Sequence, residues 1–285
     1  MSAPAADGAG YCFDLVREAD KDRFLAALFA PDDKRRLLLA LYAFNVEVSR
    51  IREVVREPML GEIRLQWWAD AVSRAYGGQG PEHPVMAELM PAIGERIIPE
   101  MALANLVEAR RFDLYDDPMP SLNDLEGYLG ETSSALIQMA ALILAGRQAQ
   151  VCAEAAGLAG VAYGMSGLLR LLPMHRARGQ CFLPEDVLAR HGLKPAHVLS
   201  GRWDEPMRAA LSDMVSLGRQ RLEEARALSG TIPAAALPAF LPASLTGLAL
   251  DAVTRRGRNP LKQVTELSQL RRQWSLWRAA RRGRF

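Results

Sequence analysis

The sequence predicts an all-α protein built as a single helical domain. Apolar residues recur at helical spacing along most of the chain, and no segment shows the strict alternation that is typical of a half-buried strand. No internal repeat or linker divides the 285 residues, and a hydrophobic content of 49% is sufficient for one large core. We therefore expect one bundle of about nine or ten helices.

The first clear helix is predicted over residues 34–56, where an apolar stripe repeats at steps of three and four. Its members are Leu37, Leu41, Phe44, Val48, Ile51 and Val55. Similar patterns predict helices over 60–76, 83–97 and 100–114, which end at glycine or proline turns or just before one. These four segments make the N-terminal part of the bundle.

The middle of the chain continues the helical pattern. Ser121 or Asn123 is expected to cap a helix whose apolar run reaches Leu144 and stops at Gly146. A further long helix is predicted to end or kink near a proline at position 173. The expected segments from there on are a helix at 149–172, a loop at 176–184, helices at 185–191 and 206–228, and short pieces at 232–250.

Three regions differ in composition and define the expected domain organisation. Residues 1–10 form a small Ala/Gly segment that we expect to be a flexible tail. Residues 11–250 form the helical domain, and residues 251–285 form a basic, Trp- and Arg-rich extension that packs on or near it. The first residues lack a basic start and an apolar run, so we expect neither a signal peptide nor a membrane anchor.

Charge and cysteine content exclude several classes of function. The net charge is only +2, so no global field favours nucleic acid as a partner. Three scattered cysteines, Cys12, Cys152 and Cys181, fit packing positions in a reducing compartment better than a disulfide or zinc framework. We therefore expect a cytoplasmic protein that is at most peripheral at the inner face of a membrane.

Two segments carry motifs whose acidic positions are altered. Residues 42–44 read Tyr-Ala-Phe, and residues 49–53 read Ser-Arg-Ile-Arg-Glu. Residues 167–184 read GLLRLLPMHRARGQCFLP. Both segments resemble the squalene/phytoene synthase family, in which an Asp-Asp-x-x-Asp motif follows a similar Tyr-Ala-Phe helix. The second signature of that family, approximately Asn-Ile-Leu-Arg-Asp-x-x-Glu-Asp-x-x-Arg-Gly-Arg-x-Tyr-Leu-Pro, aligns with residues 167–184 without gaps.

The resemblance extends over about residues 12–250. It includes Gln-Trp-Trp at 66–68, a helix start at 83–85 and Asp-Leu-Glu-Gly-Tyr at 124–128. The chain is also similar to a branch of the family that includes a mitochondrial complex I assembly factor and whose aspartate motifs are likewise eroded. The resemblance implies an isoprenoid-synthase-like helical bundle with a central cavity.

The altered positions bear directly on metal binding. Enzymes of this family hold magnesium diphosphate with carboxylates, which are the hard oxygen ligands that magnesium prefers. In the first motif, Ser49 and Arg50 replace two acids and only Glu53 keeps a carboxylate. In the second motif, an acid is missing at Leu171, Met174 and His175. We therefore predict no metal and no catalytic residue, with magnesium relevant only if the chain is an active transferase.

Proline 173 gives a second reason to expect a degenerate site. It removes a backbone donor, and we expect it to strain the turn on which Leu171 and His175 would have to align. Imidazole is moreover a poor ligand for magnesium. Both considerations favour the loss of the metal site.

Some residues have both a ligand-binding and a structural interpretation. Tyr42 and Tyr128 either line a surviving isoprenoid tunnel or pack in the core. Arg170 and Arg178 either hold a diphosphate or lipid headgroup, or form a salt bridge and a solvated loop. Glu53 is either a remnant metal ligand or an ion-pair partner.

The C-terminal segment is the one concentration of charge. Six arginines lie between residues 270 and 285, interleaved with Trp274 and Trp277. This composition suits an anionic membrane surface or an acidic partner, and equally a solvated terminal helix that packs its tryptophans on the domain.

Three functions follow from the resemblance and the altered motifs. The first is a catalytically degenerate protein that acts in binding or assembly, with a protein partner in respiratory complex I assembly. The second is an active prenyl transferase that condenses farnesyl or geranylgeranyl diphosphate to a squalene- or phytoene-like product. The third is a carrier that holds an isoprenoid without chemistry.

Overall fold

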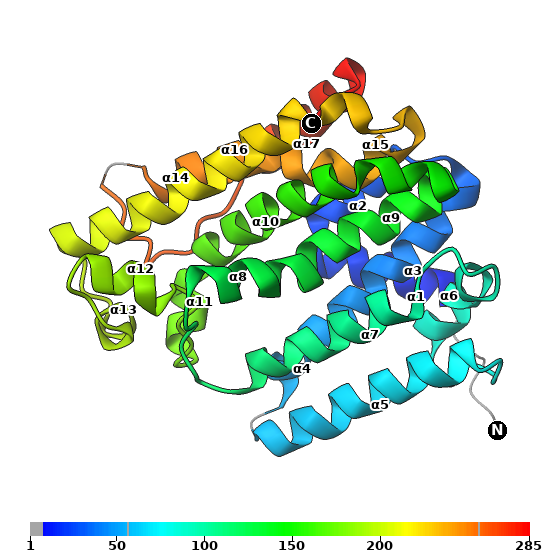
Figure 1. Cartoon of the computed structure of the whole chain (residues 1–285), viewed down its shortest axis with the longest axis horizontal. Coiled ribbons are helices and arrows are strands. Elements are labelled where there is room, and N and C mark those ends of the chain that lie inside the picture. Colours follow the sequence, from blue (N-terminus) through cyan, green and yellow to red (C-terminus); the bar gives the residue numbers. More distant parts are fainter. Residues whose placement is uncertain (1–7, 56, 256) are drawn as a thin grey trace.

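The computed structural model describes residues 8–55, 57–255 and 257–285, and all regular elements within them are helical (Figure 1). The α-helices are α1 (Gly8–Ala19), α2 (Lys21–Ala27), α3 (Asp32–Ser49), α4 (Ile51–Val54), α5 (Pro58–Tyr76), α6 (Pro84–Gly94), α7 (Glu100–Ala109), α8 (Leu122–Leu129), α9 (Ala135–Ala145), α10 (Ala153–Arg170), α11 (Leu172–Ala177), α12 (Glu185–Arg190), α13 (Pro195–Ser200), α14 (Glu205–Ala227), α15 (Leu237–Phe240), α16 (Thr246–Val253) and α17 (Gln269–Arg282). The all-α prediction is confirmed.

Six shorter helical segments connect or extend these helices. They are η1 (Arg110–Leu114), the π-helical turn η2 (Gly130–Ser134), and the 3₁₀ segments η3 (Gly146–Cys152), η4 (Ser229–Thr231), η5 (Ala234–Ala236) and η6 (Leu241–Leu245). The number of elements exceeds the nine or ten helices expected, because long periodic stretches are broken locally. The stretch predicted at 34–56, for example, divides at Arg50 into α3 and α4, and residue 56 lies outside the described residues.

Local chemistry explains several helix boundaries. The Asp20 carboxylate accepts a hydrogen bond from the Arg23 backbone N–H at 3.0 Å and caps α2. Ser121, one of the two predicted caps, accepts from the Asp124 backbone N–H at the start of α8. Gly146 has φ = 57° after α9, a conformation that glycine adopts without the steric cost of a Cβ atom.

The effect expected of Pro173 is corrected by the structure. Pro173 occupies the first turn of α11, where its missing N–H costs no hydrogen bond and its fixed φ suits a helix start. The His175 backbone N–H still donates to the Leu171 carbonyl oxygen at 3.0 Å. Proline therefore separates α10 from α11 without disrupting the turn between positions 171 and 175.

Helix α10 lies at the centre of the bundle and packs against α14, α16, α9 and η2. Segment η2 can approach α10 closely because Gly160 has no side chain. A Cβ atom at this position would lie only 2.3 Å from the Ser134 Cα atom. A large apolar core lies around α1, α3, α5, α6 and α9, and a second core lies between α8, α10, α12 and α14.

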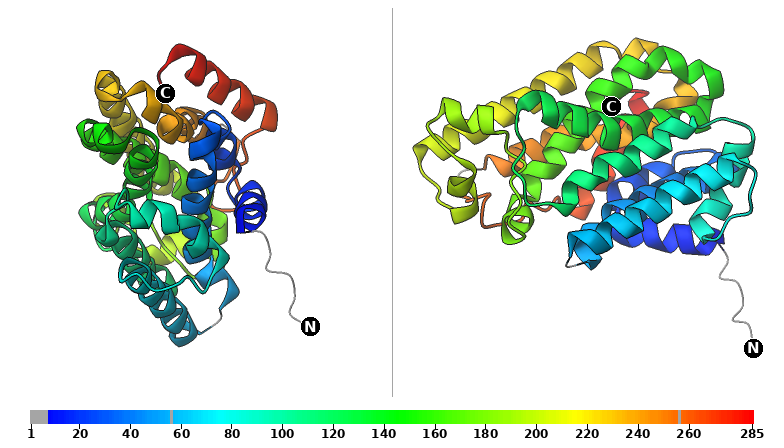
Figure 2. Two further views of the ribbon diagram at one scale, coloured as in Figure 1. Left: turned by 90° about the vertical axis from the view of Figure 1, so that its right-hand side faces the viewer. Right: turned by 60° about the horizontal axis from the view of Figure 1, so that its bottom comes forward.

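The boundaries predicted for the two terminal regions are revised. Residues 1–7 of the expected tail lie outside the described residues, and residues 8–10 already form the first turn of α1. The boundary at residue 250 falls within α16, and α17 packs against α2 and η6 along the outside of the bundle (Figure 2). The C-terminal segment is thus part of the same packed unit.

Two helical stretches are long and apolar enough to cross a membrane by length and composition alone. They are Leu122–Arg170 and Ala234–Val253, and 61% and 67% of their apolar windows are buried inside the protein. Burial of this extent is also found in the core helices of folded domains, as for α10 here.

Candidate functional site

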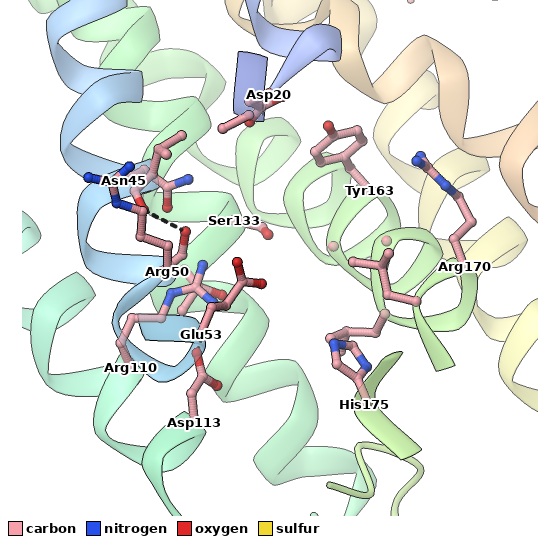
Figure 3. Close-up of a pocket in the computed structure, with 18 of the residues that line it drawn as sticks. Asp20, Asn45, Arg50, Glu53, Arg110, Asp113, Ser133, Tyr163, Arg170 and His175 are labelled. Carbon is pink, nitrogen blue, oxygen red and sulfur yellow. Dashed lines mark hydrogen bonds and ion pairs between the residues drawn. The ribbon is translucent and has the colours of Figure 1, made fainter. Parts of the chain in front are cut away.

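A cavity of about 720 Å³ lies between the two apolar cores. Its walls come from the turn between α1 and α2, the C-terminal half of α3, α4, η1, the α8–η2 junction, α10 and α11, with one residue from α17. Figure 3 shows Arg50, Glu53, Arg110 and Asp113 on one side of this cavity and His175 on the other. The cavity therefore joins the two segments that contain the altered motifs.

The first motif reaches the cavity at the end of α3 and in α4. Ser49 donates its hydroxyl hydrogen to the Val46 carbonyl oxygen at 3.2 Å, so it is engaged with its own helix. The Arg50 guanidinium lies 2.6 Å from a Glu47 carboxylate oxygen. A cation thus occupies a position where the family carries an acid, and its charge is already compensated by a neighbouring carboxylate.

The second motif faces the first across the cavity. Leu171 and His175 line the wall, whereas Met174 does not line it and is 39% exposed. Burial, together with the positive charge of Arg178, lowers the pKa of His175 to about 4. A neutral imidazole and an aliphatic side chain therefore stand where the family presents carboxylates.

Arg178 and Glu53 link the two motifs directly. An Arg178 Nη2 atom lies 3.0 Å from a Glu53 Oε1 atom. The retained acid of the first motif is thus neutralised by a retained arginine of the second, and the ion-pair interpretation of Glu53 agrees with this contact.

A buried polar cluster forms another part of the wall. Tyr128 donates to an Asp113 carboxylate oxygen at 2.8 Å and accepts from Arg110 at 2.8 Å, and Arg110 also lies 3.2 Å from the second Asp113 oxygen. Burial raises the pKa of Asp113, and burial also raises the pKa of Tyr128. Tyr128 lines the cavity, as the tunnel interpretation expects, with its hydroxyl engaged in this cluster.

Asp22 is the centre of a third polar group. One of its carboxylate oxygens accepts from Arg272 of α17, and the other lies 3.6 Å from Arg170 and 3.3 Å from the Tyr163 hydroxyl. Arg170 also donates to the Thr265 carbonyl oxygen at 3.2 Å. Arg170 therefore forms the predicted structural salt bridge while still lining the cavity.

Tyr42 does not line the cavity, contrary to its interpretation as a tunnel residue. It is 2% exposed in the core, and its ring centroid lies 5.9 Å from the Arg23 guanidinium carbon. Tyr42 shares a face of α3 with Asn45 and Ser49, which line the cavity, but it lies one turn before Asn45, and the cavity-lining Arg23 covers its ring. Its role is therefore packing.

The charge balance of the wall does not fit a magnesium cluster. Eight basic and five acidic side chains line the cavity, and Glu47 and Asp116 pair with two of the arginines without lining it. Within the described residues, no three His, Cys, Asp or Glu side chains are grouped so that they could hold a metal ion. An almost neutral wall with guanidinium groups at its centre lacks the clustered hard ligands that magnesium requires.

Several polar atoms of the wall have no hydrogen-bond partner among the described residues. They are Asn45 Oδ1, Arg52 Nε, Arg110 Nε and His175 Nδ1. Asn45 is only 6% exposed, so its amide oxygen is buried without compensation. Unpartnered buried groups of this kind are costly, and a polar ligand can satisfy them.

Sequence reasoning missed the residues that complete the site. Asp20, Asp22 and Arg23 precede the first predicted helix, and the only signal for them is the run of four charged residues at 20–23. Arg110 and Asp113 lie three residues apart in a segment predicted as helix, a spacing that indicates an ion pair. No local pattern signals the contact of Arg272 with Asp22, which are 250 residues apart.

The helical arrangement has clear structural relatives. A crystal structure of a dehydrosqualene synthase in complex with ligand superimposes with a TM-score of 0.83 at 17% sequence identity, covering 96% of both chains. A squalene synthase from Alicyclobacillus acidocaldarius gives 0.70 at 18% identity, covering 98% of this chain and 95% of that one. The fold is therefore that of the isoprenoid synthases.

The sequence comparisons define the family within this fold. Residues 16–278 match the squalene/phytoene synthase family, and the chain belongs to that family. It is 32% identical over 246 residues to the mouse (Mus musculus) protein named NADH dehydrogenase (ubiquinone) complex I, assembly factor 6, covering 84% of this chain and 74% of that protein. The Drosophila melanogaster homolog is 30% identical over 256 residues, covering 87% and 76%. A chloroplastic phytoene synthase of Zea mays is 22% identical over 219 residues, covering 75% and 51%.

Proposed function

We propose that this protein is a catalytically degenerate member of its family that acts as an assembly factor for respiratory complex I, at the cytoplasmic face of the membrane that holds the complex. The observation that carries the proposal is the ion pair between Glu53 and Arg178. It lies in a cavity where Leu171 and His175 stand at positions that are acidic in the family. Such a wall has no cluster of hard ligands with which to neutralise a departing diphosphate. The similarity to proteins named complex I assembly factor 6 supports the assembly role.

Deletion of the gene in its native host tests the assembly role. We expect the NADH dehydrogenase activity of isolated membranes and the amount of intact complex I on native gels to fall together, and both to return when the wild-type gene is restored. Unchanged complex I in the deletion strain would overturn the assembly role.

An assay with purified protein tests the degenerate site. Farnesyl or geranylgeranyl diphosphate is supplied with magnesium, and both pyrophosphate release and condensed hydrocarbon are measured. We expect neither product. Magnesium-dependent turnover that disappears in a Glu53→Ala variant would establish the active prenyl transferase instead, because Glu53 is the one acid kept in the first motif.

A second candidate function is a carrier that holds an isoprenoid or a prenyl phosphate without chemistry. The unpartnered polar atoms on Asn45, Arg52 and Arg110 favour it, since guanidinium N–H groups pair well with phosphate oxygens. Such binding would not need a divalent cation.

Calorimetry with farnesyl monophosphate in the presence of EDTA tests the carrier function, with farnesol as the uncharged control. We expect heat from the phosphate only, and weaker binding by Arg52→Gln. Arg64→Gln removes an exposed arginine of α5 away from the cavity and serves as the matched control. An isoprenoid found by mass spectrometry in extracts of the purified protein would support the carrier, whereas equal heats for both compounds would exclude recognition of the phosphate.

A further inference from the structure

Helix α17 has two faces of opposite character. Arg272, Leu276 and Ala279 are buried against α2 and η6, and Arg272 reaches the cavity wall. On the other side, Leu270 is 80% exposed and Trp274 is 60% exposed. The helix is therefore fixed to the bundle by one face and presents large apolar side chains on the other.

The exposed apolar residues form one stripe, which Arg281 extends by one turn. Leu270, Trp274, Trp277 and Arg281 follow one another at steps of four, three and four, so they share a side of the helix. The two indole rings stack with centroids 5.0 Å apart at an interplanar angle of 25°. The Arg281 guanidinium carbon lies 5.3 Å from the Trp277 ring centroid. The two indoles therefore cover part of each other's surface while Trp274 stays 60% and Trp277 43% exposed.

Charge on this surface is of one sign. Five exposed arginines flank or extend the stripe: Arg271, Arg278, Arg281, Arg282 and Arg284. No aspartate or glutamate occurs between residues 267 and 285. In the part of the chain that the structure describes, no carboxylate side chain forms a salt bridge with any of these five arginines, unlike the arginines of the cavity. Their charge is available to an external anion.

We propose that α17 docks this protein on an anionic lipid bilayer, lying in the plane of the surface with Leu270, Trp274 and Trp277 inserted among the headgroups. Indoles favour this depth because their rings are apolar and their N–H groups can reach water. Arginines on the flank of the stripe then lie at the level of lipid phosphates, to which guanidinium groups donate in pairs. An in-plane amphipathic helix with a basic polar face has this arrangement.

Vesicle flotation with the purified full-length protein tests the proposal. One set of vesicles consists of phosphatidylcholine, and the other of equal parts of phosphatidylcholine and phosphatidylglycerol. We expect binding to the anionic set only, and weaker binding as salt is raised. Each arginine removed from the pair Arg278 and Arg281 should weaken binding by about fivefold, and W274S/W277S should weaken it by at least about tenfold.

Matched variants show whether the effect belongs to α17. Met101→Ser and Val151→Ser remove apolar side chains that are 65% and 67% exposed on other parts of the surface, and Arg147→Gln removes an exposed arginine. These controls should bind as the wild type does, and circular dichroism checks that every variant is folded. In addition, the indole fluorescence of the wild type should shift to shorter wavelength on anionic vesicles, and this shift should be lost in W274S/W277S.

Three outcomes would overturn the proposal. They are binding to neither vesicle set, equal binding to both sets, and anionic binding that the α17 variants leave intact. If the wild type binds neither vesicle set but binds a soluble acidic polypeptide, and the α17 variants lose that binding, the surface is assigned to an acidic protein. Because vesicle binding is measured on the isolated protein, its result is independent of the gene-deletion test of complex I assembly.

Discussion

Arg178 and Glu53 form an ion pair with a nitrogen-to-oxygen distance of 3.0 Å, although 125 residues separate them in the sequence. Glu53 is the one acid kept in the first motif and Arg178 is one of the arginines kept in the second, and the two segments face one another across the cavity. In a metal-dependent relative, carboxylates on both walls would repel one another without a cation between them. Here the Arg178 guanidinium supplies the positive charge, so the two walls of the cavity can lie close together without a metal ion between them.

The first prediction concerns magnesium. Magnesium should leave the thermal unfolding temperature of the wild type unchanged, beyond the shift given by sodium chloride at equal ionic strength, because a ligand stabilises a protein only by binding its folded state. Glu53→Gln should change the free energy of unfolding by no more than about 1 kcal/mol, since the pair is half exposed. A magnesium-dependent rise in the unfolding temperature that disappears in Glu53→Gln would contradict the first of these statements. Differential scanning fluorimetry is sufficient for the comparison.

The second prediction concerns Asp22. Asp22→Asn removes the charge that Arg170 and Arg272 share, and it should lower the free energy of unfolding by about 3 kcal/mol because buried cations are left without a partner. Asp14→Asn is the matched control, since Asp14 pairs with Arg17 at the surface and should change stability by no more than about 0.5 kcal/mol. Urea denaturation gives both values. Equal effects of the two variants would show that the Asp22 cluster does not stabilise the fold.

The third prediction concerns the contact between α10 and η2. Gly160→Ala should destabilise the protein by about 1–3 kcal/mol, because its Cβ atom would meet the Ser134 backbone. Gly157→Ala lies in the same helix with open space at its Cβ position, and it should stabilise the protein by about 0.5–1 kcal/mol. Opposite shifts in the unfolding midpoint are expected. Shifts of the same sign would contradict the close approach of the two helices.

The fourth prediction concerns pH. Burial lowers the pKa of His175 from 6.5 to about 4, so between these values the unfolded chain binds a proton that the folded chain does not. This contribution to stability is complete above the unfolded pKa and is lost as the pH falls, by roughly 2 kcal/mol between about pH 7 and pH 5. His175→Gln should reduce the loss of stability on acidification by that amount.

The control for the pH experiment is His191→Gln, which changes a histidine that contacts Asp213 near the surface at 2.8 Å. Urea unfolding of the wild type and both variants at the two pH values isolates the contribution of His175. An equal pH dependence in wild type and His175→Gln would mean that the imidazole is hydrated in the folded protein.

Much of the fold could be predicted because it depends on local periodicity. The helices at 60–76, 185–191 and 206–228 were placed within one or two residues of their observed ends. The helix α13 (Pro195–Ser200) and the first two helices were not predicted, because short or weakly periodic segments acquire their structure from the core that they cover.

The site could be predicted only where a motif marked it. The resemblance located Glu53, Leu171 and His175, and the structure brings these residues to one cavity. The resemblance could not indicate which acid pairs with which arginine, because ion pairs such as Arg178 with Glu53 depend on packing between distant segments. The tunnel and core interpretations of Tyr42 could not be separated for a related reason: the helical pattern shows that Tyr42 is buried, and only the three-dimensional arrangement shows how far along α3 the cavity extends.

The contact of Arg272 with Asp22 has a consequence for synthesis of the chain. The second helix leaves the ribosome long before the last one, and the wall that holds Asp22 and Arg170 lacks its C-terminal partner during that interval. The charge distribution of the cavity wall is complete only after Arg272 has been synthesised and has packed against Asp22. A frameshift or stop codon within the last few turns would therefore alter the interior of the bundle, although the segment that it removes lies on the outside.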